Sequence, residues 1–177
     1  SGAYDLAIDG GGNIFVSDGG NHRVVKFDAN GGYLGHWGQQ GFGDNNSDID
    51  TLYGIAVNEA GTKVYVVDFY ANRVKSFESD GTFIAQSSSY QAPSSLPERF
   101  DNPAGIDVDP VTGTVLVTDS DNRRIKRLDG SSLAFVSNFG ALGSAEGFFL
   151  YPEGIAIDAN GYTWITDSRA DRLQRYG

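Results

Sequence analysis

The stretch YPEGIAIDANGYTWITDSRADRLQRY, Tyr151 to Tyr176, is the clearest copy of a unit that determines the fold of the whole chain. In its first part Ile155 and Ile157 alternate with small residues, and the turn-forming sequence Asp-Ala-Asn-Gly at 158–161 precedes a second apolar run at 162–166. A second polar break leads into a third run at 172–176. This pattern predicts three short antiparallel strands joined by polar turns, with no helix.

The same unit occurs three more times along the chain. Its opening strand reads DLAID, GIAVN, GIDVD and GIAID, starting at residues 5, 54, 105 and 154, so the period is about 50 residues. The second strand always ends in aspartate, and an arginine follows five positions later; the pairs are Asp18 and Arg23, Asp68 and Arg73, Asp119 and Arg124, and Asp167 and Arg172. A fourth apolar run follows in the first three copies. Four strands per repeat at this period are typical of a β-propeller blade.

These residues resemble a known family. The segment from Phe139 to Asp158, with its spaced glycines, Pro152 and the string Gly-Ile-Ala-Ile-Asp, is similar to the NHL repeat, as is the following Ile-Thr-Asp-Ser with Arg-Leu at 172 and 173. The resemblance covers nearly the whole chain. It implies a single all-β propeller domain, residues 1–177, with four NHL-type blades at about residues 4–37, 53–90, 104–139 and 153–177. This fold hosts unrelated activities, so the resemblance alone implies no function.

The strand count predicts an open arc rather than a closed ring. The fourth copy ends after its third strand and lacks the outer strand, and only residues 1–4 precede the first strand. Relatives with this repeat usually have six blades, and the chain contains no methionine, which is typical of a matured or trimmed piece. The chain is therefore expected to be an arc of a larger, six-bladed propeller. Bare strand edges and apolar blade faces promote association, so we expect it to self-associate or to be part of a longer chain.

Charge and composition exclude several classes of function. The chain has 13 Lys and Arg against 23 Asp and Glu, a formal net charge of −10. Binding to nucleic acid needs clustered positive charge, so no nucleic-acid partner is expected. No apolar run approaches 18 residues, which argues against a membrane span. The chain has no cysteine, which excludes disulfide and thiolate chemistry within it.

A binding scaffold and an enzyme remain as alternatives. The peptidyl-hydroxyglycine amidating lyase has a propeller that resembles this one and holds zinc with three histidines, one after the proline that opens a first strand. The matching positions here are Tyr53, Ala104 and Glu153, and the two histidines lie elsewhere, at His22 and His36. No Ser-His nucleophile motif is recognisable. The sequence therefore favours a non-catalytic module that presents propeller loops to a protein or small ligand; the alternative is a calcium-dependent lactonase- or lyase-like enzyme.

The predicted binding residues lie at the openings of the first strands and in one loop. Tyr53 and Glu153, together with Ala104, should ring the central entrance on one face of the propeller. The adjacent aromatics Phe69 and Tyr70 occupy the break after the second strand of the second copy, where the other copies have small or polar residues. Two neighbouring aromatic rings on a loop can stack on a ligand or partner, or cover a neighbouring loop.

Acidic and amide residues alternate in the first linker, at Asp44, Asn46, Asp48 and Asp50. They resemble the first half of a calcium loop, in which oxygen ligands wrap the cation, and predict calcium as a cofactor if the protein has one. The turn glycine and the bidentate glutamate of such a loop are missing. The alternative is a polar linker in which Ile49 occupies the place that Phe100 and Phe149 occupy in later copies.

Two further features are expected to be structural. The Asp and Arg pairs recur identically, whereas a catalytic site needs asymmetry, so each carboxylate should accept N–H groups of its own turn and each arginine should bridge to a carboxylate or carbonyl. Asp107 stands where three other first strands have alanine. If these strands are innermost, Asp107 needs a hydrogen-bond partner or a water-filled channel, because an unpaired buried carboxylate costs several kcal/mol.

Overall fold

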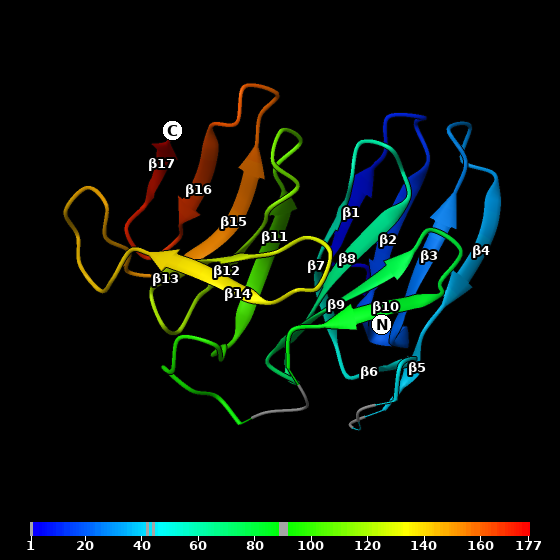
Figure 1. Cartoon of the computed structure of the whole chain (residues 1–177), viewed down its shortest axis with the longest axis horizontal. Coiled ribbons are helices and arrows are strands. Elements are labelled where there is room, and N and C mark those ends of the chain that lie inside the picture. The colour runs from blue at the N-terminus through cyan, green and yellow to red at the C-terminus, as the bar shows by residue number, and fades with distance from the viewer. Residues whose placement is uncertain (1, 42, 44, 89–91) are drawn as a thin grey trace.

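The computed structural model describes residues 2–41, 43, 45–88 and 92–177, and it is an all-β propeller arc of four blades (Figure 1). Blades 1 to 3 are four-stranded antiparallel sheets, and blade 4 has three strands, as the sequence predicts. Two small elements were not predicted: a 3-10 turn at Gly19–Asn21 and a parallel pair of two-residue strands, β5 (Gln39–Gln40) and β6 (Asp48–Ile49), in the first linker. No described segment forms a helix long and apolar enough to span a membrane.

The strands of each blade follow the chain order from the centre outward. Blade 1 consists of β1 (Asp5–Ile8), β2 (Ile14–Asp18), β3 (Arg23–Phe27) and β4 (Tyr33–Trp37). Blade 2 consists of β7 (Leu52–Val57), β8 (Lys63–Asp68), β9 (Arg73–Glu78) and β10 (Phe83–Gln86). Blade 3 consists of β11 (Pro103–Val108), β12 (Val115–Asp119), β13 (Arg124–Leu128) and β14 (Phe135–Phe139), and blade 4 of β15 (Pro152–Ile157), β16 (Thr163–Asp167) and β17 (Arg172–Tyr176). The predicted end of blade 2, residue 90, lies outside the described residues.

The break between the second and third strands has the same backbone shape in every blade. The residue before each arginine has a positive φ between 49° and 57°; these residues are His22, Asn72, Arg123 and Asp171. In every blade a left-handed residue ends the turn before the third strand, although the four side chains differ. His22 is thus a turn residue, and its Nδ1 contacts the Asp50 carbonyl of the first linker.

The core consists of three apolar clusters, one at each junction between neighbouring blades. The first strands β1, β7, β11 and β15 pack side by side in that order. One bulky linker residue is fully buried at each junction: Ile49, Phe100 and Phe149. This confirms that Ile49 takes the place of the later phenylalanines.

Asp107 also has a hydrogen-bond partner, since its carboxylate accepts the N–H of Ile157 in blade 4 at 2.7 Å. The prediction that its strand lies innermost in the blade therefore stands.

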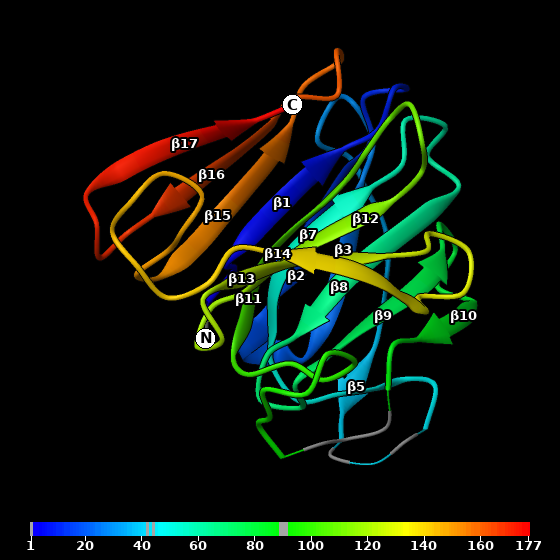
Figure 2. The ribbon, with the colours of Figure 1, turned by 60° about the vertical axis from the view of Figure 1, so that its left-hand side comes forward.

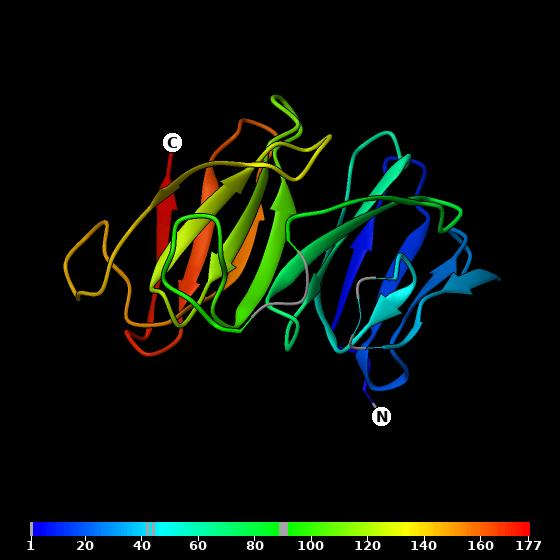
Figure 3. The same ribbon diagram turned by 60° about the horizontal axis from the view of Figure 1, so that its bottom comes forward.

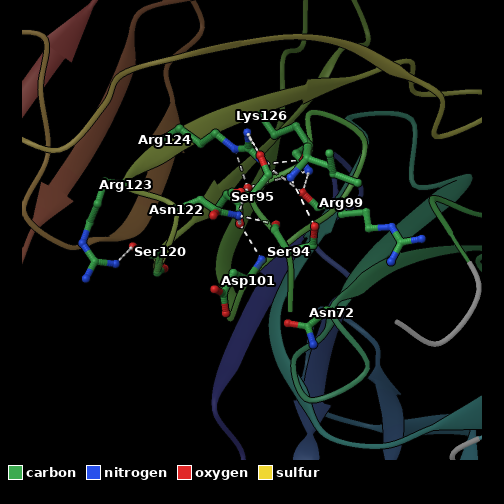
Figure 4. A network of polar contacts seen from close by, with 12 residues as sticks. Asn72, Ser94, Ser95, Arg99, Asp101, Ser120, Asn122, Arg123, Arg124 and Lys126 are labelled. Carbon is green, nitrogen blue, oxygen red and sulfur yellow. Dashed lines mark hydrogen bonds and ion pairs between the residues drawn. The ribbon is translucent and has the colours of Figure 1, made fainter. Parts of the chain in front are cut away.

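In blades 2 to 4 the Asp and Arg pair binds the linker that enters the blade, as Figure 4 shows for blade 3. In blade 1, Asp18 accepts instead from the Asn21 side chain of its own turn. Arg124 pairs with Asp119 at 2.6 Å and donates to the Arg99 carbonyl at 2.9 Å, while Asp119 accepts the N–H of Asp101 at 2.7 Å. The pairs are structural, as predicted, but the backbone partners are in the linker and not in the pair's own turn. The pair thus satisfies backbone groups of the linker where it enters the blade.

The arc is open between its two ends. Blade 1 packs on blade 2, and blade 4 packs on blade 3, so each end blade has one outward face (Figures 1 and 2). Viewed from below in Figure 3, the end blades, blue and red, lie at opposite ends of the molecule.

Candidate binding face

A cavity lies where the first strands of the four blades begin. In every blade, the residue just before the opening sequence of the first strand (DLAID, GIAVN, GIDVD or GIAID) lines this cavity. These residues are Tyr4, Tyr53, Ala104 and Glu153. The cavity has a volume of about 310 Å³, and Asp5, Ile106 and Ile155 also line it. The propeller register therefore brings together residues about 50 positions apart and places them around one opening.

Four aromatic rings form a continuous stack on the side of blades 1 and 2. The rings of Tyr4 and Tyr53 stack at 4.6 Å between centroids, Tyr53 and Phe69 stack at 4.3 Å, and Phe69 meets Tyr70 edge to face at 5.0 Å. Gly19, at the position of Phe69 in blade 1, leaves room for the Tyr4 ring, since a Cβ there would lie 2.6 Å from it. Both ends of the stack are open, with Tyr4 53% and Tyr70 59% exposed.

The opposite side, formed by blades 3 and 4, is charged. The guanidinium of Arg169 lies 4.4 Å and that of Arg123 lies 5.5 Å from the centre of the Tyr151 ring, in cation–π contact. Arg123 also pairs with Asp121 at 3.0 Å. Arg169 is exposed, as is the nearby Glu153.

The acidic groups of the face change the titration of their neighbours. Burial raises the pKa of Asp5, although its carboxylate accepts the N–H groups of Ile55 at 3.1 Å and Leu6 at 2.9 Å. Burial, with a contribution from Glu153, also raises the pKa values of Tyr53 and Tyr151. Since both tyrosines experience the field of Glu153, this carboxylate lies between the aromatic side and the charged side.

The structure brings the four predicted binding residues together. Tyr53 and Glu153 line the cavity, and Phe69 and Tyr70 extend the stack away from it. Sequence reasoning missed Tyr4, Tyr151 and Arg169. Tyr4 could have been found, because it precedes DLAID as Tyr53 precedes GIAVN. The contact between Tyr151 and the two arginines had no sequence signal, because it depends on how blades 3 and 4 approach. That these residues bind a ligand remains a prediction.

The predicted calcium ligands occupy the first linker. Asp44 lies outside the described residues, and Asp48 is buried, with its carboxylate accepting from Gln39 Nε2 and Asn45 Nδ2 at 3.1 Å each. Asp50 is also buried and donates its backbone N–H to Asp68. Within the described part of the chain, no group of three or more His, Asp or Glu side chains is placed to hold a metal. The calcium site remains a prediction.

Comparison with known families agrees with the geometry of the blades. A model of the NHL repeat matches residues 4–27 and 100–128, in blades 1 and 3. These two segments carry the NHL repeat. The matched segments are the first three strands of each of these blades, which are also the strands that position the cavity residues and the Asp and Arg pairs.

Solved structures share the fold of this chain at low sequence identity. A chain of the nidogen/laminin complex matches with a TM-score of 0.73 and 22% identity, covering 98% of this chain and 60% of its own. Streptogramin B lyase matches with a TM-score of 0.64 and 17% identity, over 97% and 53%. A catalytically inactive virginiamycin B lyase from Staphylococcus aureus with quinupristin gives 0.65 and 14%, over 99% and 55%. The chain therefore spans a little more than half the length of these structures, and the likeness is one of fold.

Proposed function

We propose that this chain is a non-catalytic binding module that holds a protein partner on its central face. The observation that carries the proposal is the stack of four aromatic rings, from Tyr4 to Tyr70, open at both ends and beside a cavity of about 310 Å³. Aromatic side chains supply large contact areas at a small cost in conformational entropy and dominate many protein interfaces. A loop or extended segment with apolar or proline residues would cover the stack.

The charged residues around the cavity support a partner that carries a basic group and an acidic group at matching places. Asp5 and Glu153 line the cavity, so a basic side chain of the partner is the complementary group to enter it. Arg169 is exposed at the rim and suits an acidic side chain. This pattern would set the direction in which a segment lies across the face. One of the matched chains comes from a complex of two proteins, nidogen and laminin, which supports a protein as the partner.

The test is capture by immobilised protein with a matched pair of double variants. Phe69→Ala with Tyr70→Ala should weaken binding of a captured partner at least about tenfold and shift the melting temperature little, because both rings lie on a loop. The control is Tyr33→Ala with Leu34→Ala, an equally adjacent and exposed pair on the outer strand β4. It should bind as the parent does. Equal binding by both double variants would contradict the proposal.

The alternative of a calcium-dependent enzyme has its own test. It rests on the residues of the first linker and on a fold shared with two lyases. Calcium that raises the melting temperature, together with loss of that effect in Asp48→Asn, would favour it over the binding module. Since Asp48 is buried and hydrogen-bonded, its variant must be compared with the parent in the presence of chelator.

A further inference from the structure

A second cavity lies between blades 2 and 3, on the face opposite to the aromatic stack. Ala104, near the start of β11, lines the cavity described above, whereas Val108, at the end of β11, lines this one. The turns after β7, β11 and β13 form the rest of its wall, and the first two of these turns lie at the upper edge of Figure 1. We call it the hairpin cavity. Its volume of about 520 Å³ is within the range of small-ligand sites.

Three of the four blades carry a cation at one position of the third strand, opposite a large apolar or aromatic residue of the second strand. The cross-strand pairs at this position are Phe15 with Lys26, Tyr65 with Ser76, Leu116 with Arg127, and Trp164 with Arg175. Blade 2 is the exception, since its Ser76 is short, uncharged and 1% exposed. In blade 3, Arg127 lines the smaller cavity between blades 3 and 4, of about 220 Å³. The larger cavity thus follows the blade that lacks the cation.

In blade 1 the cation reaches across to the next blade. Lys26 Nζ lies 5.0 Å from the centre of the Phe15 ring and donates to the Ser79 carbonyl, in the turn after β9 of blade 2, at 3.2 Å. Gly130 holds the same repeat position as Ser79 in the turn after β13 of blade 3. Its carbonyl accepts the Tyr65 hydroxyl of blade 2 at 2.8 Å instead. A neutral hydroxyl therefore replaces the ammonium at the wall of the hairpin cavity, which both Tyr65 and Gly130 line.

The wall of the hairpin cavity has an excess of negative charge. Glu59, Asp109 and Asp129 line it together with one cation, Lys63. Within the part of the chain that the structure describes, no lysine or arginine forms an ion pair with any of these three carboxylates. A ligand cation would therefore meet carboxylates that the protein itself leaves without a counter-ion.

Asp129 and Tyr65 offer hydrogen-bond acceptors at this wall. Ser131 and Ser132 donate to Asp129 Oδ1 through their N–H groups, at 3.0 and 2.9 Å, and through their hydroxyls. Among the described residues none donates to Asp129 Oδ2. The bonds from the two serines lower the pKa of the Asp129 carboxyl, which is charged at neutral pH. The Tyr65 hydroxyl gives its only hydrogen to Gly130 and can still accept a bond.

We propose that the hairpin cavity binds an organic cation, an ammonium or guanidinium group on an aliphatic stem. The bound cation supplies between blades 2 and 3 the charge that Lys26 supplies between blades 1 and 2. Asp109 and Asp129 pair with it, and the Tyr65 oxygen accepts one of its N–H groups. Its stem packs on Val108 and the other aliphatic residues of the wall, as the stems of lysine and arginine pack on apolar surfaces.

The test is calorimetric titration with agmatine, which carries a guanidinium and an ammonium on one aliphatic stem. An ionic strength of about 0.15 M screens the general attraction of a cation to this acidic chain. We expect saturable binding of one agmatine. Asp129→Asn keeps the Oδ1 acceptor for the serines but removes the charge, and should weaken binding at least about tenfold. The control is Asp28→Asn at the same repeat position in blade 1, where Oδ1 accepts the N–H groups of Asn30 and Gly32. It changes the net charge equally, lies away from the cavity and should bind within about twofold of the parent.

Ser76→Lys introduces the cation that the other blades carry, and in a folded variant it should abolish agmatine binding. If this variant does not fold, Asp129→Asn against Asp28→Asn decides the matter alone. The peptide acetyl-Gly-Arg-Gly-amide distinguishes the source of the cation: its binding would indicate an arginine side chain of a partner, and binding of agmatine alone a free ligand.

Three results would overturn the inference. They are no saturable binding of agmatine or the peptide to the folded parent, equal losses in Asp129→Asn and Asp28→Asn, and parental binding by a folded Ser76→Lys. Phe69→Ala with Tyr70→Ala should leave agmatine binding unchanged, because both rings lie on the opposite face. Failure of the proposed function at the aromatic stack would therefore leave this result as it is.

Discussion

The junction between blades 3 and 4 and the outward face of blade 4 are built from the same repeat positions, but they have opposite environments. At the junction, Ile125 is fully buried in a cluster with Phe149 and Ile165; on the outward face, Leu173 stands in solvent. The sequences of the two third strands, RIKRL and RLQRY, do not indicate this difference. Burial in a propeller is therefore a property of the neighbouring blade, and the same substitution should have different consequences at the two places.

The largest difference should come from truncating the apolar junction residue. Ile125→Ala removes a fully buried side chain from the cluster at the junction and should lower the free energy of unfolding by about 2–5 kcal/mol. Leu173→Ala, at the same register, should change it by less than about 0.5 kcal/mol. Urea unfolding followed by circular dichroism measures both. Similar losses for the two variants would show that the outward face of blade 4 is covered in solution.

The two regions should also differ in their response to alkaline pH. Burial lowers the pKa of Lys126 to about 8, against the opposing field of Asp119. The folded state therefore binds fewer protons than the unfolded state between about pH 8 and 10.5, and Lys126 should make the protein more stable as pH rises through that window, by up to about 3 kcal/mol. Blade 4 has Gln174 at this position, where its side chain donates to the Phe148 carbonyl at 2.9 Å.

The measurement is the unfolding free energy of the parent, Lys126→Met and Gln174→Met across this range. The gain should disappear in Lys126→Met and persist in Gln174→Met. Tyrosines with raised pKa values, such as Tyr65 and Tyr176, titrate above their usual range and lower stability at still higher pH in all three proteins alike. If the unfolding free energy still rises with pH in Lys126→Met, a titrating group other than Lys126 causes the rise.

The contrast between junction and face also shows what the sequence could predict. Strand positions, the missing outer strand, the buried Ile49, Phe100 and Phe149, and the need of Asp107 for a partner all followed from the period of the repeat. These features are set within one repeat or by its register. The aspartates of the breaks were expected to accept N–H groups of their own turns, but in blades 2 to 4 they accept N–H groups of the linker, and Tyr4 was not predicted to join the aromatic stack. Such contacts depend on how closely two blades approach, which periodicity within one blade does not determine.

The smallest predicted effect concerns a single hydroxyl. Thr118→Val removes the acceptor of the Gly105 N–H and the donor to the Glu153 carbonyl inside the junction, which should cost about 1–2 kcal/mol. Valine fits this position, because blade 2 has Val67 there, fully buried, so the cost reports the hydrogen bonds and not the packing. Thr166→Val makes the same change on the outward face, where water can replace the lost partner of the Gly154 N–H, and should cost less than about 0.5 kcal/mol. Equilibrium unfolding of the two variants tests this. The double variant measures their coupling, because the two hydroxyls bind the two ends of one peptide group, the Glu153 carbonyl and the Gly154 N–H. A cost for Thr166→Val equal to that for Thr118→Val would mean that the hydroxyl serves only its own blade, and the junction bond would lose its role in joining the blades.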